Sequence, residues 1–214
     1  MMDCSCSEER LFFDATQRNR EPIARVLEPL LPSCGLLLEI ASGSGEHLCY
    51  LQNRFGSSHP ELHWQGSDPE PLHRASLVAW ARHLQLPGRL PPLDLDATKT
   101  PWPRINPVMI LCINMVHIAP WQASEGLFEE AGRQLMPGRL LVLYGPFFEN
   151  SVTTSPSNEA FDAHLRNIDS RWGLRHLDQL EFLAKKHWLG FAGRWTMPAN
   201  NLMIAFRRLE AKAS

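Results

Sequence analysis

The sequence has no apolar run that approaches the roughly 20 residues needed to cross a bilayer. Its first ten residues contain no apolar stretch of the signal-peptide type. The C-x-x-C motif is absent, and the cysteine count of five is odd. These absences predict reduced thiols in a cytoplasmic protein that does not associate with membranes.

A strong excess of one charge is also absent. The chain has 21 Lys and Arg against 23 Asp and Glu, a net charge of −2, and no basic stripe, which disfavours a DNA or RNA substrate. His59 and His63 have metal-ligand spacing, but Pro60 between them argues against a helix, so no metal site is predicted. With 214 residues, 44% of them hydrophobic, we expect one globular domain over residues 18–214 after a loosely ordered segment, 1–17.

One stretch contains an apolar run, a small Gly-rich turn and a helical segment in series. The run Leu36–Ile40 is predicted to be a strand, and Glu46–Phe55 to be a helix. Gly43 and Gly45 in the turn permit positive φ and leave no Cβ between the backbone and a ligand. The first N–H groups of the helix point at the same turn. This arrangement is typical of a site for a nucleotide-like cofactor.

The details of this stretch favour S-adenosylmethionine (SAM). Leu48 stands where a dinucleotide fingerprint requires its third glycine, and no P-loop motif occurs. Glu39, at the strand end, would repel a pyrophosphate but suits a cation such as the ammonium group of SAM. The pattern E-x-A-x-G-x-G is similar to the first motif of class I SAM-dependent methyltransferases, with Ala41 where glycine is common. The residues predicted here to bind the cofactor are Glu39, Ala41, Ser42, Gly43 and Gly45. A plain tight turn is the alternative.

Further acidic residues follow the next predicted strands. Leu62–Ser67 reads as a strand that ends at Asp68, which lies 25 residues after Gly43 and is placed to accept the ribose hydroxyls. Its alternative role is to cap the helix predicted over Leu72–Leu84. The segment Arg89–Asp96 is a weaker strand, because two prolines interrupt it, and it would suit an edge. Asp96 and Ala97 after it are predicted to meet the adenine. Asp94 is the competing carboxylate, and a solvated loop is the other alternative.

The rest of the chain predicts an α/β fold. Its elements are expected to be a first helix over Arg18–Leu31 capped by Asn19, strands over Val108–Ile113 and Arg139–Tyr144, helices over Gln122–Leu135 and Leu177–Lys186, and alternating strands over Trp188–Trp195 and Leu202–Phe206. Strands and helices in series favour a parallel sheet with right-handed crossovers. We therefore predict a Rossmann-like class I methyltransferase fold with a mostly parallel seven-stranded sheet, helices on both faces and a C-terminal antiparallel hairpin.

Polar residues after the buried strands indicate where the chemistry would occur. Asn114, His117 and Tyr144 fall at strand ends, where open α/β sheets bind ligands, and are the predicted catalytic residues. His117 has an ordinary pKa near neutrality and is the candidate base, with a structural histidine as its alternative. Asn114 would also orient the cofactor. The polar segment Phe147–Asp169, with a short helix at Asn158–Leu165, is expected to cover the cofactor and to form one wall of the acceptor pocket.

The chain also resembles methyltransferase-like protein 26 and its bacterial relatives. The matching stretches are Arg18–Ile23, Glu39–Gly45, Ser67–Pro69, Cys112–Ile118, Glu125–Phe128, Tyr144–Phe147, Ser157-Asn158 with Phe161-Asp162, Trp172–Leu174 and Met197–Asn201. Asn19, in the first of them, completes the predicted set of cofactor-binding residues. The resemblance implies the fold and SAM as cofactor, but no substrate. Glu46, where Gln is commoner, and the divergent stretch Glu181–Arg194 depart from the pattern.

These observations predict a SAM-dependent methyltransferase that acts on a small molecule or a protein. The alternative is a SAM-binding sensor or scaffold without catalysis. A nicotinamide oxidoreductase is disfavoured by the missing third glycine and by Glu39.

Overall fold

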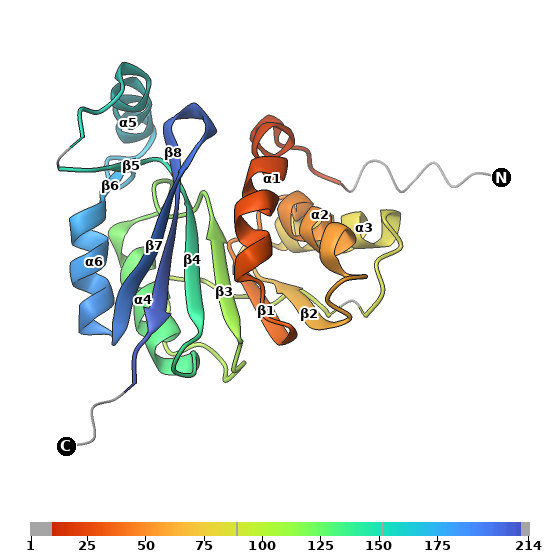
Figure 1. Cartoon of the computed structure of the whole chain (residues 1–214). Helices are drawn as coiled ribbons and strands as arrows, with labels where there is room; N and C mark the ends of the chain where they lie inside the picture. Colours follow the sequence, from red (N-terminus) through yellow and green to blue (C-terminus); the bar gives the residue numbers. More distant parts are fainter. Residues whose placement is uncertain (1–9, 89, 151, 211–214) are drawn as a thin grey trace. The chain divides into compact units, whose positions relative to one another are not determined.

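Apolar residues form the buried parts of the strands in the computed structural model, which describes residues 10–88, 90–150 and 152–210 (Figure 1). The chain divides after Asp96 into two compact units. The single domain predicted for residues 18–214 remains a prediction.

The first unit pairs two parallel strands and carries three helices. β1 (Cys34–Ile40) and β2 (Glu61–Gly66) run in register from Cys34 opposite Glu61 to Glu39 opposite Gly66. The helices are α1 (Asp14–Leu27), which continues into the 3₁₀ turn η2 (Glu28–Leu30), α2 (Glu46–Phe55) and α3 (Pro71–His83). Helix α2 confirms the predicted bounds, because its glycine turn and its apolar face both mark them in the sequence.

The start of α1 corrects the sequence analysis. The helix begins at Asp14, not Arg18, and its N-cap is Phe13, not Asn19. The N–H of Phe13 donates to Glu46 at 2.7 Å, and the N–H of Leu11 donates to Ser76 at 2.8 Å. These contacts from distant residues fix a segment that was expected to be loose. The first nine residues of the predicted 1–17 segment lie outside the described residues.

The predicted strand over residues 89–96 is also wrong. Leu93 forms an isolated bridge with Ser67, in which its N–H donates to Gly66 and its carbonyl accepts from Asp68. Pro91 and Pro92 lack the N–H groups that a longer ladder needs. Arg89 lies outside the described residues.

The larger sheet of the second unit contains four strands, in the order β3-β4-β8-β7. β3 (Met109–Ile113) and β4 (Leu140–Gly145) are parallel, while β8 (Asn201–Arg208) pairs antiparallel with both β4 and β7 (Leu189–Met197). The other elements are α4 (Trp121–Gln134), α5 (Pro156–Ile168), α6 (Leu177–Lys186), the short parallel pair β5 (Phe147–Phe148) and β6 (Arg175–His176), and the 3₁₀ turn η3 (Pro198–Asn200).

The predicted fold class is confirmed, with one correction to the strand count. The described residues show the α/β arrangement, the parallel pairs and the C-terminal antiparallel hairpin. Apart from the short β5–β6 pair, they contribute two strands in the first unit and four in the second, six instead of seven. The proline-interrupted segment before Asp96 accounts for one strand fewer.

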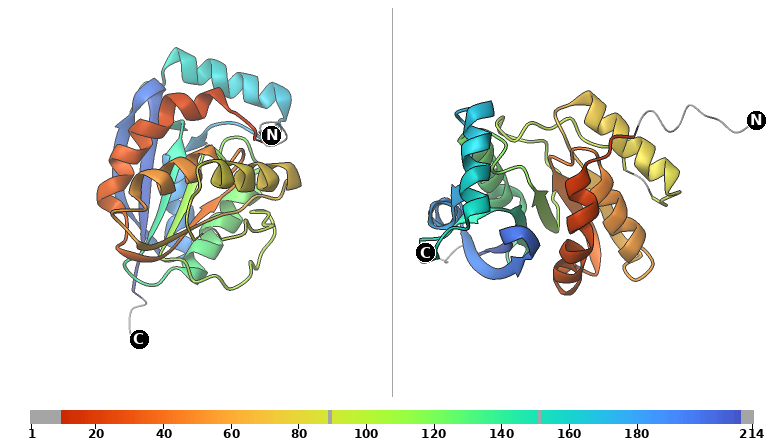
Figure 2. Two further views of the ribbon diagram at one scale, coloured as in Figure 1. Left: turned by 90° about the vertical axis from the view of Figure 1, so that its right-hand side faces the viewer. Right: turned by 90° about the horizontal axis from the view of Figure 1, so that it is seen from above.

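Helix α5 is longer than the segment predicted for it. It begins with Pro156 at its first position, and Ser155 caps it by accepting a hydrogen bond from the N–H of Asn158 at 3.3 Å. One end of α5 lies beside the turn between β7 and β8 (Figures 1 and 2). The irregular part of the predicted lid is therefore short, and most of the segment is helical.

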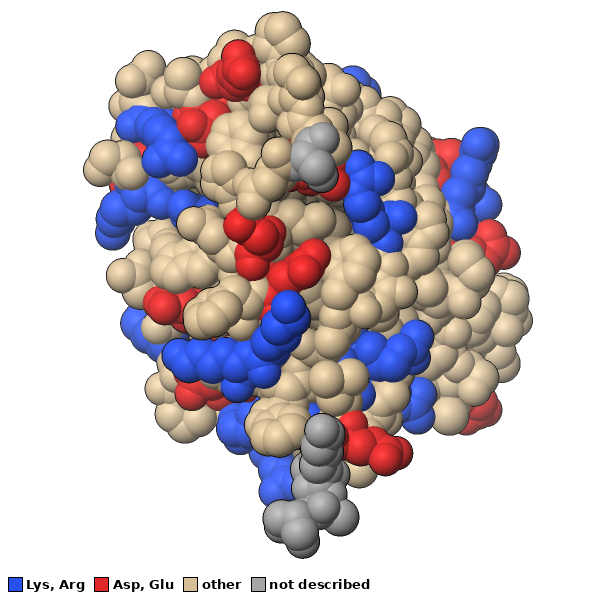
Figure 3. Space-filling view, turned by 60° about the vertical axis from the view of Figure 1, so that its left-hand side comes forward, with Lys and Arg blue, Asp and Glu red and all other residues tan. Residues whose placement is uncertain are grey.

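The surface seen in Figure 3 intersperses Lys and Arg with Asp and Glu, as the near-balanced composition predicts. Within the part of the chain that the structure describes, no helix has the length and apolar character needed to cross a membrane.

Two glycines with similar backbone angles provide a test of the packing. Gly45 has a φ of +83°, and a Cβ there would lie 2.6 Å from the Cα of Leu77 in α3, whereas Gly138 has a φ of +86° and open space around it. The two Ala variants share the φ strain, but only Gly45→Ala meets the backbone of α3. We expect Gly45→Ala to lower the free energy of unfolding by about 1–3 kcal/mol more than Gly138→Ala, the usual cost of overpacking. Urea denaturation measures it, and equal losses would contradict the packing role.

Candidate functional site

The Gly-rich turn of the first unit requires left-handed backbone at three positions. Ala41, Gly43 and Gly45 have φ values of 55°, 55° and 83°. The family pattern's glycine at position 41 thus has a conformational reason, which Ala41 meets at some cost. Ser42 and Ser67 bind the ends of β1 and β2 together, because the N–H of Ser42 donates to the carbonyl of Ser67 at 2.8 Å and the N–H of Ser67 donates to Ser42 Oγ at 3.2 Å.

Glu39 is buried at the end of β1, with only 1% of its surface exposed. Its Oε2 has no hydrogen-bond partner among the described residues. Burial raises the pKa of this carboxyl to about 8, and the nearby Asp68 raises it further, while a hydrogen bond from Ser42 opposes the shift. A buried acceptor without a partner costs about 1–3 kcal/mol, so its presence requires an explanation such as a ligand.

Asp68 already accepts three hydrogen bonds. Its Oδ2 accepts from the N–H of Gly43 at 2.9 Å, and its Oδ1 accepts from the N–H of Glu70 at 2.9 Å and from His73 at 3.0 Å. A carboxylate has about four acceptor positions, so one remains. The N-cap of α3 is Glu70, so Asp68 does not take the helix-cap position that was its alternative role. Its three bonds leave room for one further donor and not for two.

The two glycines of the turn face protein side chains. A Cβ on Gly43 would lie 3.2 Å from the ring of Phe13, and that ring lies 6.2 Å from the ring of His73. Gly45 faces Leu77, so its missing Cβ has a role in helix packing, and its predicted role in cofactor binding stays a prediction. The sequence did not predict Phe13 and His73 as site residues, because neither belongs to a motif.

The other predicted cofactor residues of this unit have protein partners. Asn19 Oδ1 lies 2.7 Å from Nε2 of buried His47. Burial lowers the pKa of His47 to about 4, so its ring is neutral, and the N–H at Nε2 donates a hydrogen bond to Asn19. Asp94 pairs with Arg74 at 3.2 Å and is exposed, while Asp96 is half-buried. Neither carboxylate is singled out by this geometry as the adenine partner.

In the second unit, Asn114 and His117 both lie beside Gly145, and the backbone of Asn114 is bonded to that of Tyr144. Asn114, with a φ of 60°, donates its N–H to the carbonyl of Tyr144 at 2.9 Å. A Cβ on Gly145 would lie 3.1 Å from Nδ1 of His117 and 3.8 Å from Oδ1 of Asn114. The absent side chain at position 145 therefore makes room for both polar groups. The fourth predicted residue of this unit, Ala97, is buried, and its carbonyl packs against Gly126 of α4.

His117 is buried, and its Nδ1 has no partner among the described residues. The ring packs edge-on against Phe161 of α5 at 5.7 Å. Burial, with a smaller effect of the Arg175 charge, lowers the pKa of His117 to about 4. The expectation that it titrates near 6.5 is therefore wrong, and its ring is neutral at physiological pH.

Arg175 holds the loop that carries His117, which sequence reasoning missed. Its guanidinium donates to the carbonyls of Val116 at 3.1 Å, Ala119 at 2.7 Å and Arg171 at 2.9 Å. The N–H of Gly173 also donates to the carbonyl of His117 at 2.9 Å. The segment before α6 thus fixes the loop after β3 through backbone carbonyls, which no side-chain pattern in the sequence reveals.

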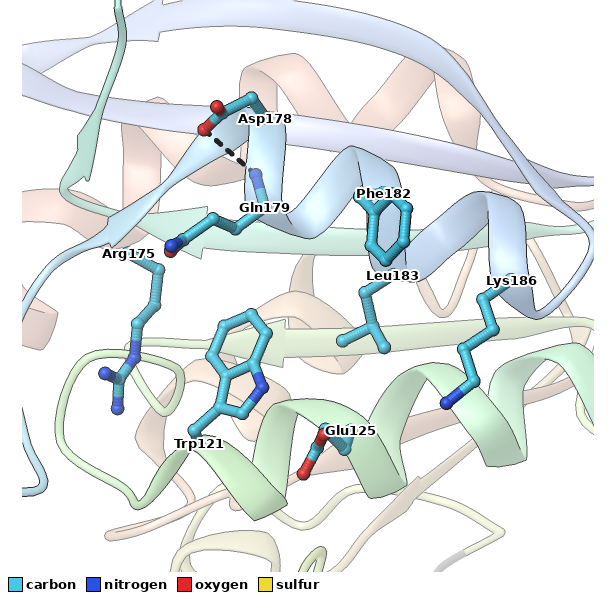
Figure 4. Close-up of a pocket in the computed structure, with 8 residues that line it drawn as sticks. All are labelled: Trp121, Glu125, Arg175, Asp178, Gln179, Phe182, Leu183 and Lys186. Atoms are coloured by element: carbon cyan, nitrogen blue, oxygen red, sulfur yellow. Dashed lines mark hydrogen bonds between the residues drawn. The ribbon is translucent and has the colours of Figure 1, made fainter.

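Among the described residues, the second unit forms a larger and a smaller cavity near its helices. The larger, about 590 Å³, lies between α4 and α6, with Arg175 and Trp121 at one end and Lys186 at the other (Figure 4). The smaller, about 160 Å³, lies among the segment before α5, the start of α5 and the β7–β8 turn. The larger is formed mostly by helix side chains, whereas the smaller adjoins the end of β4, where this class of fold binds ligands. Among the residues described, no three His, Cys, Asp or Glu side chains are grouped to hold a metal.

Comparison with known proteins places the chain in a family. Residues 10–208 match the model of the family described as "Protein of unknown function (DUF938)". The chain belongs to this family.

Solved structures share its fold. An O-methyltransferase family protein from Burkholderia thailandensis is 17% identical, with a TM-score of 0.73 over 93% of this chain and 59% of its own. Human N-acetylserotonin methyltransferase in complex with SAM is 14% identical, with a TM-score of 0.69 over 92% and 53%. A methyltransferase in calicheamicin biosynthesis, in its SAH-bound form, is 16% identical, with a TM-score of 0.69 over 92% and 54%. The chain thus spans less than two thirds of the length of these proteins.

The buried carboxyl of Glu39 makes stability depend on pH. Folding raises its pKa from 4.5 to about 8, so the stability due to its buried neutral form is complete below about pH 4.5 and is lost as the pH rises toward 8. We expect the free energy of unfolding to fall relative to that of Glu39→Gln, by at most about 1.4 kcal/mol per pH unit in this range. Urea denaturation across the range, with Glu159→Gln on exposed α5 as control, measures it. A constant difference would contradict the raised pKa.

His117 should remain neutral over the physiological range. Because burial lowers its pKa to about 4, its ring nitrogen shifts should not change between about pH 5.5 and 8. NMR of ¹⁵N-labelled histidine side chains, with the signal assigned from its loss in His117→Gln, measures this. A midpoint near 6.5 would show that the ring is hydrated rather than packed against Phe161.

Proposed function

We propose that this protein is a SAM-dependent methyltransferase that acts on a small-molecule acceptor, with a protein acceptor as the alternative. The observation that carries the proposal is the unpartnered, buried Oε2 of Glu39 beside the Gly-rich turn. A cation beside it would satisfy the orphaned acceptor and lower the pKa of the carboxyl. The shared fold of the O-methyltransferases supports the proposal, as does the resemblance to the methyltransferase-like protein 26 family.

The residues of the first unit fit such a cofactor. Glu39 would bind its ammonium group, and the one remaining acceptor position of Asp68 would take a ribose hydroxyl. Phe13 would form a wall over Gly43. When bound, SAM supplies an activated methyl group, so the protein needs chiefly to position the acceptor.

The residues of the second unit fit the acceptor's side of the reaction. The unpartnered Nδ1 of neutral His117 would accept a hydrogen bond, and in turn a proton, from a hydroxyl or amine. Asn114 would orient the same group through its amide, and buried Tyr144 would support it through the backbone bond to Asn114. The near-balanced charge disfavours nucleic acid, and the five cysteines fit the cytoplasm.

The pH dependence of SAM binding tests the role of Glu39. The carboxyl must lose its proton to pair with the ammonium group, so affinity should rise between about pH 6 and 7.5, up to tenfold per pH unit, below the usual titration range of an α-amino group. Calorimetry should show proton release in the parent and none in Glu39→Gln. Equal affinity and pH dependence in the two proteins would remove the basis of the proposal.

Two further measurements separate the competing functions. A thermal-shift comparison of SAM, its demethylated product and NADH should show stabilisation by the first two only, since SAM and NADH differ in charge where Glu39 lies. Incubation of cell extract with methyl-labelled SAM should then label an acceptor. Binding without any transfer would favour the non-catalytic sensor or scaffold.

A further inference from the structure

The smaller cavity unites two motifs that the cofactor site leaves unexplained. Ser157-Asn158 begins α5, and Met197–Asn201 forms the turn between β7 and β8. The amide of Asn158 donates to the carbonyl of Asn200 at 3.1 Å, and the amide of Asn200 donates to Ser157 at 3.1 Å. Reciprocal hydrogen bonds therefore hold the two segments on either side of the cavity.

These bonds fix which end of each amide is free. The amide nitrogens of Asn158, Asn200 and Asn201 donate to protein oxygens, Asn201 to the carbonyl of Pro198 at 3.1 Å. Within the described residues, no hydrogen bond reaches their side-chain oxygens. All three residues line the cavity, and Asn158 is 8% exposed. The cavity is thus lined by three residues with an amide oxygen that can accept a hydrogen bond, together with the hydroxyl residues Thr153 and Thr154.

The turn between β7 and β8 also has left-handed backbone at two residues, of which Asn200 lines the cavity. Ala199 and Asn200 have φ values of 55° and 57°, in the left-handed region that favours glycine. Strain of this kind costs about 1–3 kcal/mol per residue and clusters at ligand sites.

The charges around the cavity cancel. Arg194 donates to Glu149 through Nε at 2.6 Å and through Nη2 at 2.7 Å, a bidentate pair on the cavity wall. Neither side chain is left to balance a charged ligand, and burying an unpaired charge is costly. The cavity therefore suits an uncharged molecule that donates several hydrogen bonds.

Its position points toward the proposed reaction site. Phe161, which packs against His117, follows Asn158 by three residues, so both lie on one face of α5. Phe147 lines the cavity and follows Gly145, which faces His117, by two residues.

We propose that this cavity is the acceptor pocket and that it binds a small uncharged polyol, or the polyol end of a larger molecule. The role as methyl acceptor rests on the proposed function, whereas binding of the polyol does not. At about 160 Å³ the cavity holds the volume of about five waters, which limits the group that enters it.

Titration calorimetry with glycerol, D-ribose and D-glucose tests the binding. At least one should bind, and D-glucosamine and D-glucuronate, which add a charge to the glucose frame, should bind at least tenfold more weakly than D-glucose. Tighter binding of either charged sugar, or no binding of any uncharged polyol, would overturn the proposal.

Variants locate the bound polyol. Thr154→Val removes a hydroxyl without changing shape, and Asn200→Ala removes an amide; each should weaken binding about tenfold. Asn106→Ala is the matched control for Asn200→Ala, because Asn106 also has a left-handed φ, 52°, and does not line the cavity. Unchanged binding in Thr154→Val and a folded Asn200→Ala would overturn the site.

A parallel SAM titration distinguishes the two proposals. Polyol binding without SAM binding would refute the methyltransferase and keep the pocket. SAM binding with no polyol binding would refute the pocket and keep the methyltransferase.

Discussion

The first unit depends on a carboxyl group that lies in the core without a full set of partners. Glu39 is followed directly by the Gly-rich turn, and the carbonyl of Glu39 accepts a hydrogen bond from Ser67 Oγ at 2.9 Å. The backbone that carries the carboxyl is therefore fixed by the residue that follows β2, and the side chain is buried, with only 1% of Glu39 exposed. Burial keeps the carboxyl protonated at neutral pH, since its pKa is about 8. A neutral acid that becomes charged only beside a cation would couple cofactor binding to proton release, which a surface carboxylate would not do.

In the second unit, distant residues hold the irregular loop that follows β3. The residues after β3 have few side-chain partners of their own, and Asn114 has a left-handed backbone. Backbone carbonyls of this loop accept instead from Arg175 and from Gly173. Such carbonyls would otherwise be unsatisfied or solvated. The guanidinium of Arg175 supplies the hydrogen-bond donors that backbone N–H groups supply in a helix or sheet. The site geometry thus depends on a segment nearly 60 residues further along the chain.

The sequence predicted elements where local pattern and packing agree, and failed where distant contacts decide. Helix α2 has a glycine turn before it and an apolar face along it, so its bounds are visible. The start of α1 is not, because Glu46 holds Phe13 from another helix. The cofactor motif was recognisable, yet the contact of Gly45 with Leu77 is one that only the packing of α3 reveals. The same holds for His117, since its identity suggested a pKa near 6.5, and its burial sets it near 4.

That low pKa bears on how methyl transfer would be accelerated under the proposed function. A general base contributes about 10²- to 10⁴-fold when its pKa lies near the working pH, and less when it is a weak base. With a pKa of about 4, His117 is such a weak base, although its ring is neutral at the working pH. Correct placement of two reactants is worth roughly 7–11 kcal/mol, which is well above the contribution of a weak base. The geometry agrees with placement as the main source of acceleration, because Gly145 and Phe161 confine the ring of His117 and leave its Nδ1 unpartnered. A confined neutral imidazole is best suited to align a hydroxyl through one hydrogen bond and to take its proton only as the new bond forms.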